Sequence, residues 1–330
     1  MTTELIARFV IILIIGGTQM PLDQLIDQSY HAYLFVYFTV EDEGGEQVYF
    51  SVSQDGLHWK DLNGGKPVLI SGIGECGIRD PFIIRSPLDE KFYIIATDLR
   101  IASEKGWDAA QYSGSRSIIV WESTDLVHWS KERSVNIDLP DAGCVWAPET
   151  IFDEETEEHL IFWASMVKRD ENPAKQIIYS TRTKDFKYYS TPEIYIEREN
   201  HIIDTTMIKD GNTYYRYSKD ETKKCIIVEQ SSSLIPSSFV ELNSTVLDNM
   251  LGVEGPAVFK FNDRNEWCLM IDQFAAKKGY LPLVTDDLSS GQFRILNESE
   301  YYLGDTLKRH GSILNITSTE YESLVRAYKV

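Results

Sequence analysis

The chain has 330 residues, 43% of them hydrophobic and 12% aromatic, which is enough for a packed core and excludes global disorder. Its 51 acidic and 32 basic residues give a formal net charge of -19, which argues against nucleic acid and anionic membranes as partners and favours a neutral or cationic ligand. The four cysteines lie far apart without a CxxC pair, so neither a zinc site nor a small disulfide scaffold is expected.

The first segment of the chain resembles a targeting sequence. Residues 9–15 are apolar, follow Arg8 and precede two glycines, which is the order of features in a secretory signal. The apolar stretch is too short to span a bilayer. Glu4 and the absence of an Ala-x-Ala site leave an N-terminal tail as the alternative. We therefore expect residues 1–29 to be a signal peptide of a secreted protein or, if they are not a signal, a tail of a cytoplasmic one.

Short β-forming runs, broken by clusters of Gly, Asn, Asp and Ser, begin near residue 30 and continue almost to the end of the chain. They recur in sets of four, and a new set begins about every 50 to 70 residues, which is typical of a β-propeller. Complete sets begin at residues 79, 146, 204 and 254.

The two ends of the chain complete the repeat. Residues 32–59 supply three strand-like runs without a leading strand, and residues 310–315 supply a single run that can replace it. A blade shared between the termini closes the ring and leaves no open sheet edge. The sequence therefore predicts an all-β, five-bladed β-propeller that forms one catalytic domain over residues 30–330. An irregular β-sandwich is the alternative.

Acidic residues open three of the expected inner strands. Asp80, Asp204 and Glu254 stand at these positions, and the innermost strands of a propeller line its central channel. We therefore expect the three carboxylates to meet in one axial pocket, together with His310 at the head of the shared blade. Cleavage of a glycosidic bond needs one carboxylic acid and one carboxylate, and a third carboxylate can raise the pKa of the acid.

The motifs at the strand heads resemble those of glycoside hydrolase family 43, whose members are five-bladed propellers, over nearly the whole chain from about residue 31. The resemblance implies that Asp80 is the general base, Glu254 the general acid, and Asp204 the residue that orients the acid and raises its pKa. It also implies inversion by a single displacement on α-L-arabinofuranosides or β-D-xylosides. The motifs are Asp80-Pro81-Phe82-Ile83, Ser123-Thr124-Asp125-Leu126-Val127-His128-Trp129, Trp146-Ala147-Pro148-Glu149, Ile203-Asp204 and Glu254-Gly255-Pro256.

The same resemblance suggests residues around the catalytic groups. His310 looks like the axial histidine that many members place beside a calcium ion or its waters, so it is a candidate metal ligand for a structural Ca²⁺; no cofactor is required for the chemistry. Thr205 and Glu149 replace a usual Pro and a frequent Asp, which puts the substrate preference in doubt. The candidate substrate-binding residues are Phe82, Trp146, Glu149, Arg309 and His310.

Two other functions remain open. The Arg-Asp-Pro motif at residues 79–81 also fits the fructoside-active propellers of families 32 and 68, but residues 1–79 lack the N-terminal Asp nucleophile of those enzymes. A propeller that binds glycans without cutting them is the second alternative, although it would have no use for three clustered carboxylates. We therefore predict a monomeric glycosidase with a carbohydrate substrate.

Overall fold

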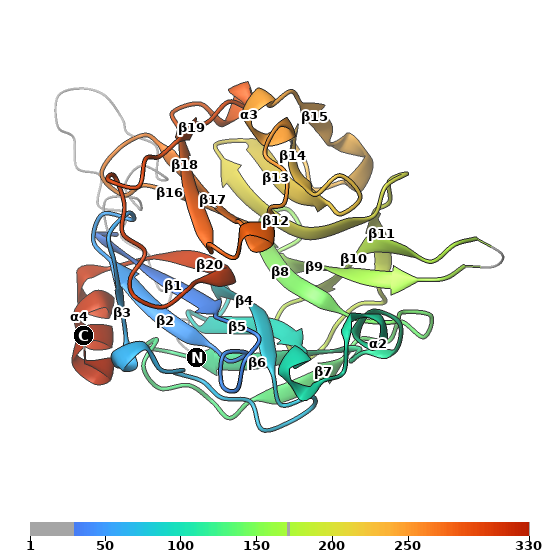
Figure 1. Ribbon diagram of the computed structural model, residues 1–330, viewed down its shortest axis with the longest axis horizontal. Helices are drawn as coiled ribbons and strands as arrows, with labels where there is room; N and C mark the ends of the chain where they lie inside the picture. Colours follow the sequence, from blue (N-terminus) through green and yellow to red (C-terminus); the bar gives the residue numbers. More distant parts are fainter. Residues whose placement is uncertain (1–29, 170–171, 330) are drawn as a thin grey trace, which may run out of the picture.

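The computed structural model describes residues 30–169 and 172–329, and within them the strands form five four-stranded antiparallel sheets. The sheets are arranged as blades around one axis (Figure 1). Their inner strands contact one another in turn around the ring, in the order β20, β4, β8, β12, β16 and back to β20. The predicted five-bladed β-propeller is confirmed. The candidate signal at residues 1–29 lies outside the described residues.

Four of these blades are continuous in the sequence, and each runs outward from its inner strand in chain order. Every connection inside a blade is a hairpin, so neighbouring strands are antiparallel. The strands are β4 (Ile78–Arg85), β5 (Phe92–Asp98), β6 (Ser117–Ser123) and β7 (Arg133–Asn136); β8 (Trp146–Asp153), β9 (Glu158–Val167), β10 (Lys175–Thr183) and β11 (Glu193–Ile196); β12 (Ile202–Asp210), β13 (Thr213–Asp220), β14 (Cys225–Ser231) and β15 (Val240–Leu242); and β16 (Glu254–Lys260), β17 (Trp267–Asp272), β18 (Tyr280–Thr285) and β19 (Arg294–Ile295).

The remaining blade joins the two ends of the described chain. Its order is β20 (Arg309–Ile316), β1 (Ala32–Phe38), β2 (Tyr49–Ser53) and β3 (Trp59–Asp61), so the inner strand comes from the C-terminal part. Leu34 of β1 lies opposite Leu314 of β20. This pairing closes the ring as the sequence predicted.

The core lies between the blades, because both faces of most sheets are covered by a neighbour. Every residue of β1 is buried, which explains why its sequence is a continuous apolar and aromatic run. Between two other blades, Tyr93 stacks on Phe186 with ring centroids 4.2 Å apart. Aromatic side chains therefore supply much of the packing between blades.

Helices are few and peripheral in the described residues. They are α2 (Trp107–Ser113), α3 (Thr245–Asp248) and α4 (Ser318–Tyr328). A capping box of Thr317 and Glu320 starts α4, which packs against β1 on the outside of the shared blade (Figure 1). Within residues 30–169 and 172–329, no helix is long and apolar enough to cross a membrane.

Candidate active site

The inner strands share a β-bulge close to their first residues. The register of β4 on β5 shifts between Arg79 and Phe82, and shifts occur at the matching points of β8, β12 and β16. A bulge of this kind turns the chain and changes where the next side chain points. In each of these bulges one residue has a positive φ: Asp80 (50°), Ala147 (47°), Asp204 (49°) and Gly255 (51°).

The strand heads meet in a pocket with a volume of about 610 Å³. As predicted, Asp80, Asp204 and Glu254 all line it. Three further predicted residues, Trp146, Arg309 and His310, line the same pocket. Residues that the sequence had not indicated complete the wall, among them Arg79, Trp107, Lys219, Glu221 and Phe274.

Phe82 and Glu149 are not among the residues that line this pocket, so their role in substrate binding stays a prediction without support from the pocket. Both occupy the first paired position after the bulge, one on β4 and the other on β8. Phe82 packs into the hydrophobic cluster that contains Tyr93 and Val145. Glu149 is buried, and its Oε1 lies 3.8 Å from Nε2 of His310. Residues before or within the bulges, such as Arg79, Asp80 and Trp146, line the pocket instead.

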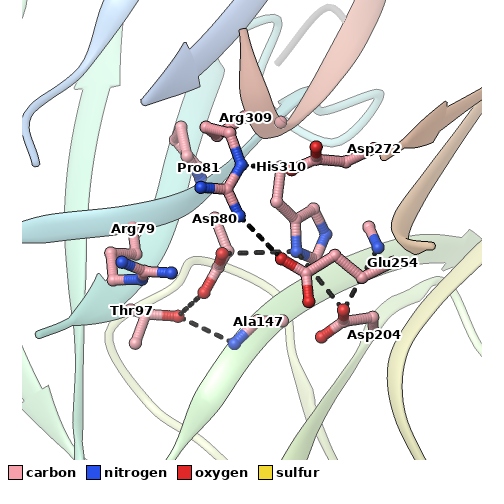
Figure 2. A network of polar contacts seen from close by, with 12 residues as sticks. Arg79, Asp80, Pro81, Thr97, Ala147, Asp204, Glu254, Asp272, Arg309 and His310 are labelled. Carbon is pink, nitrogen blue, oxygen red and sulfur yellow. Dashed lines mark hydrogen bonds and ion pairs between the residues drawn. The ribbon is translucent and has the colours of Figure 1, made fainter. Parts of the chain in front are cut away.

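Asp80 is a partly buried carboxylate with polar contacts to both of its oxygens. Oγ1 of Thr97 donates to its Oδ2 at 2.8 Å, and Nδ1 of His310 lies 3.2 Å from its Oδ1 (Figure 2). Burial opposes the charge, but His310 and Arg79 outweigh it and hold the pKa of Asp80 below its usual range. Asp80 is therefore ionised at neutral pH, as a general base must be.

Glu254 is held by two cations. Nη2 of Arg309 donates to its Oε1 at 2.9 Å, and Nζ of Lys219 donates to its Oε2 at 2.8 Å. Burial opposes ionisation, but Lys219 and Arg309 outweigh it and lower the pKa of Glu254. The sequence had predicted a raised pKa for this group. The difference arises because no feature of the sequence indicates that the side chain of Lys219 contacts Glu254.

Asp204 has the opposite character. Its Oδ2 accepts a hydrogen bond from the backbone N–H of Gly255 at 3.1 Å. Burial raises the pKa of Asp204 to about 6, and the charges of Glu254 and Asp80 act in the same direction. Asp204 and Glu254 are therefore electrostatically coupled, as expected, but the raised pKa is that of Asp204.

His310 lies between the carboxylates. Its Nδ1 is 3.9 Å from Oδ2 of Asp204 as well as close to Asp80, and its Nε2 faces Glu149. Although burial opposes the charge, Asp204 and Asp80 raise the pKa of His310 well above its ordinary value.

His310 is also the predicted ligand of a structural Ca²⁺ ion. Among the residues that the structure describes, no group of three or more His, Cys, Asp or Glu side chains is placed to hold a metal ion. Calcium at the axis stays an untested prediction, and no step below depends on it.

Trp107 extends the aromatic wall of the pocket. It opens α2, is 43% exposed, and meets Trp146 edge to face with ring centroids 6.0 Å apart. The guanidinium of Arg79 lies 5.1 Å from its ring. Two indoles at one side of the pocket offer a surface on which a sugar ring can stack.

A family model described as "Probable glycosyl hydrolase domain", related to glycoside hydrolase family 43, matches residues 28–322 of the chain. The chain belongs to this family. The family 43-related domain is therefore a glycosidase, as predicted. It is 30% identical over 289 aligned positions to an α-L-arabinofuranosidase of Bifidobacterium longum subsp. longum, an alignment that covers 74% of this chain and 27% of that protein. The chain thus spans about a quarter of the length of this relative.

Proteins whose solved structures are similar to this family 43-related domain are named for action on different linkages. They include a family 43 β-1,3-galactosidase with a TM-score of 0.59 and 14% identity, covering 90% of this chain and 59% of that chain. An endo-1,4-β-xylanase of Bacteroides thetaiotaomicron has a TM-score of 0.55 and 16% identity, covering 85% and 93%. An α-L-arabinanase of Cellvibrio cellulosa in complex with arabinohexaose has a TM-score of 0.55 and 12% identity, covering 83% and 96%. These likenesses show the fold alone.

Proposed function

We propose that this glycosidase removes α-L-arabinofuranosyl groups from plant cell-wall polysaccharides or oligosaccharides, with β-D-xylosyl groups as the second candidate. The convergence of Asp80, Asp204 and Glu254 in one pocket carries the proposal. The choice of arabinofuranoside is supported by the name of the Bifidobacterium longum relative. A pocket of about 610 Å³ is of the size that takes a small ligand.

The reaction we propose is a single displacement that inverts the anomeric carbon. Asp80 takes a proton from a water molecule while the water oxygen bonds to the anomeric carbon. Glu254 gives its proton to the glycosidic oxygen as the bond to the leaving group breaks. Asp80 ends the step protonated and Glu254 ionised, and solvent exchange restores both.

The surrounding charges favour this end state. Lys219 and Arg309 already contact the two oxygens of Glu254 and stabilise the carboxylate that forms. The active form of the enzyme has a charged Asp80 and a protonated Glu254. Because the pKa values of both groups are low, this form is populated mainly at acidic pH. We expect activity to fall as rising pH removes the proton from Glu254.

A panel of p-nitrophenyl glycosides tests the substrate. We expect the highest kcat/KM on the α-L-arabinofuranoside, a lower value on the β-D-xyloside, and none on β-D-galactoside or fructoside substrates. Faster release from any of the others would refute the arabinofuranoside assignment. Sugar binding without turnover on any substrate would identify a glycan-binding propeller instead.

Two substitutions and one NMR measurement test the roles. Asp80→Asn and Glu254→Gln should each lower kcat by at least about 10²- to 10⁴-fold with an unchanged circular dichroism spectrum. Asp125→Asn, in an exposed surface turn, is the matched control and should keep wild-type activity. Near wild-type rates in either pocket variant would refute the assignment. Proton NMR of the first product anomer tests inversion, and a retained anomer would exclude a single displacement.

A further inference from the structure

Lys219 is a buried lysine in direct contact with the proposed acid. It lies near the end of β13, and only 3% of its side chain is exposed. Its Nζ is 2.8 Å from Oε2 of Glu254 and 2.6 Å from Oε2 of Glu221. The ring of Phe274 lies against the same ammonium group, with its centroid 4.3 Å from Nζ. One ammonium group is thus shared between two carboxylates.

Charged groups from five strands act on Glu254. Lys219 comes from β13, and Arg309 comes from β20. Asp204 of β12, Asp272 of β17 and Arg79 of β4 act on it through space.

Both cations in contact with Glu254 have a second carboxylate partner. Arg309 also donates to Asp272 at 2.6 Å, and Asp272 is fully buried. The second partner of Lys219, by contrast, lines the pocket, and 24% of the side chain of Glu221 is exposed. The other oxygen of Glu221 pairs with Lys224. Glu221 can therefore be altered without placing a new unpaired charge in the core.

We propose that Lys219 is a positioning residue that stabilises the ionised form of Glu254 after proton donation, and that Glu221 moderates this effect by holding the same ammonium group. The inference rests on the proposed role of Glu254 as the general acid. Burial opposes the charge of Lys219, but Glu254, Asp204 and Glu221 raise its pKa above the ordinary value, so the group stays cationic in the working pH range.

The two residues should act on Glu254 with opposite signs. Lys219→Met removes a positive charge, so Glu254 holds its proton to higher pH. Glu221→Gln removes a negative charge and leaves Lys219 to Glu254 alone, so Glu254 loses its proton at lower pH. If Lys219 and Glu221 only supported the fold, their substitutions would not move the titration of Glu254 in opposite directions.

The test is the pH dependence of kcat/KM, measured on the glycoside that the wild type cleaves best. We expect the basic limb to move up by about one pH unit or more in Lys219→Met, since an opposite charge at this distance shifts a pKa by about 1–3 units. We expect a downward move in Glu221→Gln. Lys219→Arg keeps the charge and should leave the limb near its wild-type position. Lys223→Met is the charge-matched control, because Lys223 is exposed and its ion pair is with Asp220 at 3.9 Å.

The inference is overturned if the basic limb stays in place in both Lys219→Met and Glu221→Gln, or if it moves in the same direction in both. It is also overturned if Lys223→Met shifts this limb as far as Lys219→Met does. If Lys219→Met fails to fold, as judged by circular dichroism, the sign of the shift in Glu221→Gln decides. Activity retained in Glu254→Gln would refute the proposed function itself. An inactive Glu254→Gln together with unmoved limbs would refute only the role of Lys219 and Glu221.

A direct titration covers the case of weak turnover. Wild-type and variant proteins carrying ¹³C at the glutamate carboxyl carbons are titrated by NMR, and Glu254→Gln assigns the signal of Glu254. The same opposite shifts are expected. Identical titration curves in wild type, Lys219→Met and Glu221→Gln would overturn the inference.

Discussion

Asp61 ties the two ends of the propeller together, and its removal should unfold the ring at lower denaturant concentration. Its Oδ1 accepts hydrogen bonds from Nζ of Lys308 at 2.6 Å and from Oγ of Ser51 at 2.7 Å. Its Oδ2 accepts from the backbone N–H groups of Asp305 and Thr306 at 2.9 and 2.7 Å. Asp61 ends β3, whereas its partners at residues 305–308 lead into β20. The contacts thus close the shared blade.

The expected cost follows from the burial of the pair. The side chain of Lys308 is 0% exposed and that of Asp61 is 9% exposed. Asp61→Asn would leave the ammonium group buried without a counter-charge, which costs about 3–5 kcal/mol of unfolding free energy. Asp61→Asn with Lys308→Met removes both charges, so the double variant should be more stable than Asp61→Asn alone.

The pKa values of the two partners point in different directions. Burial opposes the charge of Asp61, but Lys308 and the hydrogen bonds lower its pKa to about 2, whereas burial lowers the pKa of Lys308 against the attraction of Asp61. The carboxylate is the better guide to the part of the cost that depends on acidic pH, because Asp61 is the partner that titrates there. A shift from 3.8 to about 2 corresponds to about 2 kcal/mol, which is present above pH 4 and lost as the pH falls through 2.

Urea unfolding followed by tryptophan fluorescence measures the effect. Asp55→Asn is the matched control, because Asp55 lies in an exposed turn and half of its side chain is accessible. It should cost less than about 1 kcal/mol. The reasoning is refuted if Asp61→Asn costs no more than this control, if the double variant is less stable than Asp61→Asn, or if the gap between wild type and Asp61→Asn does not narrow as the pH falls from 4 towards 2.

Three further predictions concern the pocket. Asp204→Asn should leave the basic limb of the kcat/KM profile near its wild-type position, because Asp204, with a pKa of about 6, is still protonated where Glu254 loses its proton; a limb moved to lower pH would contradict this order of titration. Trp107→Ala should raise KM for arabino-oligosaccharides about three- to tenfold and leave KM for an aryl glycoside nearly unchanged, and equal changes would exclude a role in binding the remoter sugar. Burial raises the pKa of Glu149 from its ordinary value of 4.5 to about 7. Its charge therefore destabilises the fold as the pH rises through this range, and Glu149→Gln should melt higher than wild type at pH 8 but not at pH 4. A lower melting temperature at pH 8 would show that the charge is needed by His310.

The fold was predictable because its signals are local. A turn that repeats in the sequence, at residues 53–59 and 123–129, has the same geometry in both copies. Oδ1 of Asp55 and of Asp125 each accept the backbone N–H groups two and three residues later. The motifs at the strand heads and the missing inner strand of the first blade then fixed the number of blades and the place where the ring closes.

The site was predictable only where it follows from strand order. Asp80, Asp204 and Glu254 head inner strands, so the ring alone brings them together. Lys219 lies near the end of β13, the second strand of its blade. Its contact with Glu254 of the next blade depends on how the two blades pack. Phe82 was assigned to the pocket by proximity to Asp80, but a bulge inserts one residue and changes which residues share a face.

The bulges explain how the carboxylates are held as well as where they lie. The backbone N–H of Gly255 donates to Asp204, so the bulge of one blade supports the carboxylate of the blade before it. The N–H of Ala147 in β8 donates to Oγ1 of Thr97 at 2.7 Å, and Thr97 in turn donates to Asp80 of β4 (Figure 2). The bulge of the β8 blade thus also supports the carboxylate of the blade before it, but through the hydroxyl of Thr97.

The backbone of each bulge contains one residue with a positive φ. Ala147 has a φ of 47°, a conformation that costs a residue with a Cβ about 1–2 kcal/mol. At Gly255 any side chain is excluded, because a Cβ would lie 2.7 Å from the ring of His310. Strain that persists at matching points of successive blades is typical of a functional site. The relative position of Asp80 and Asp204 is therefore set by blade-to-blade packing, and a substitution that loosens the contact between blades should disturb catalysis before it disturbs the fold.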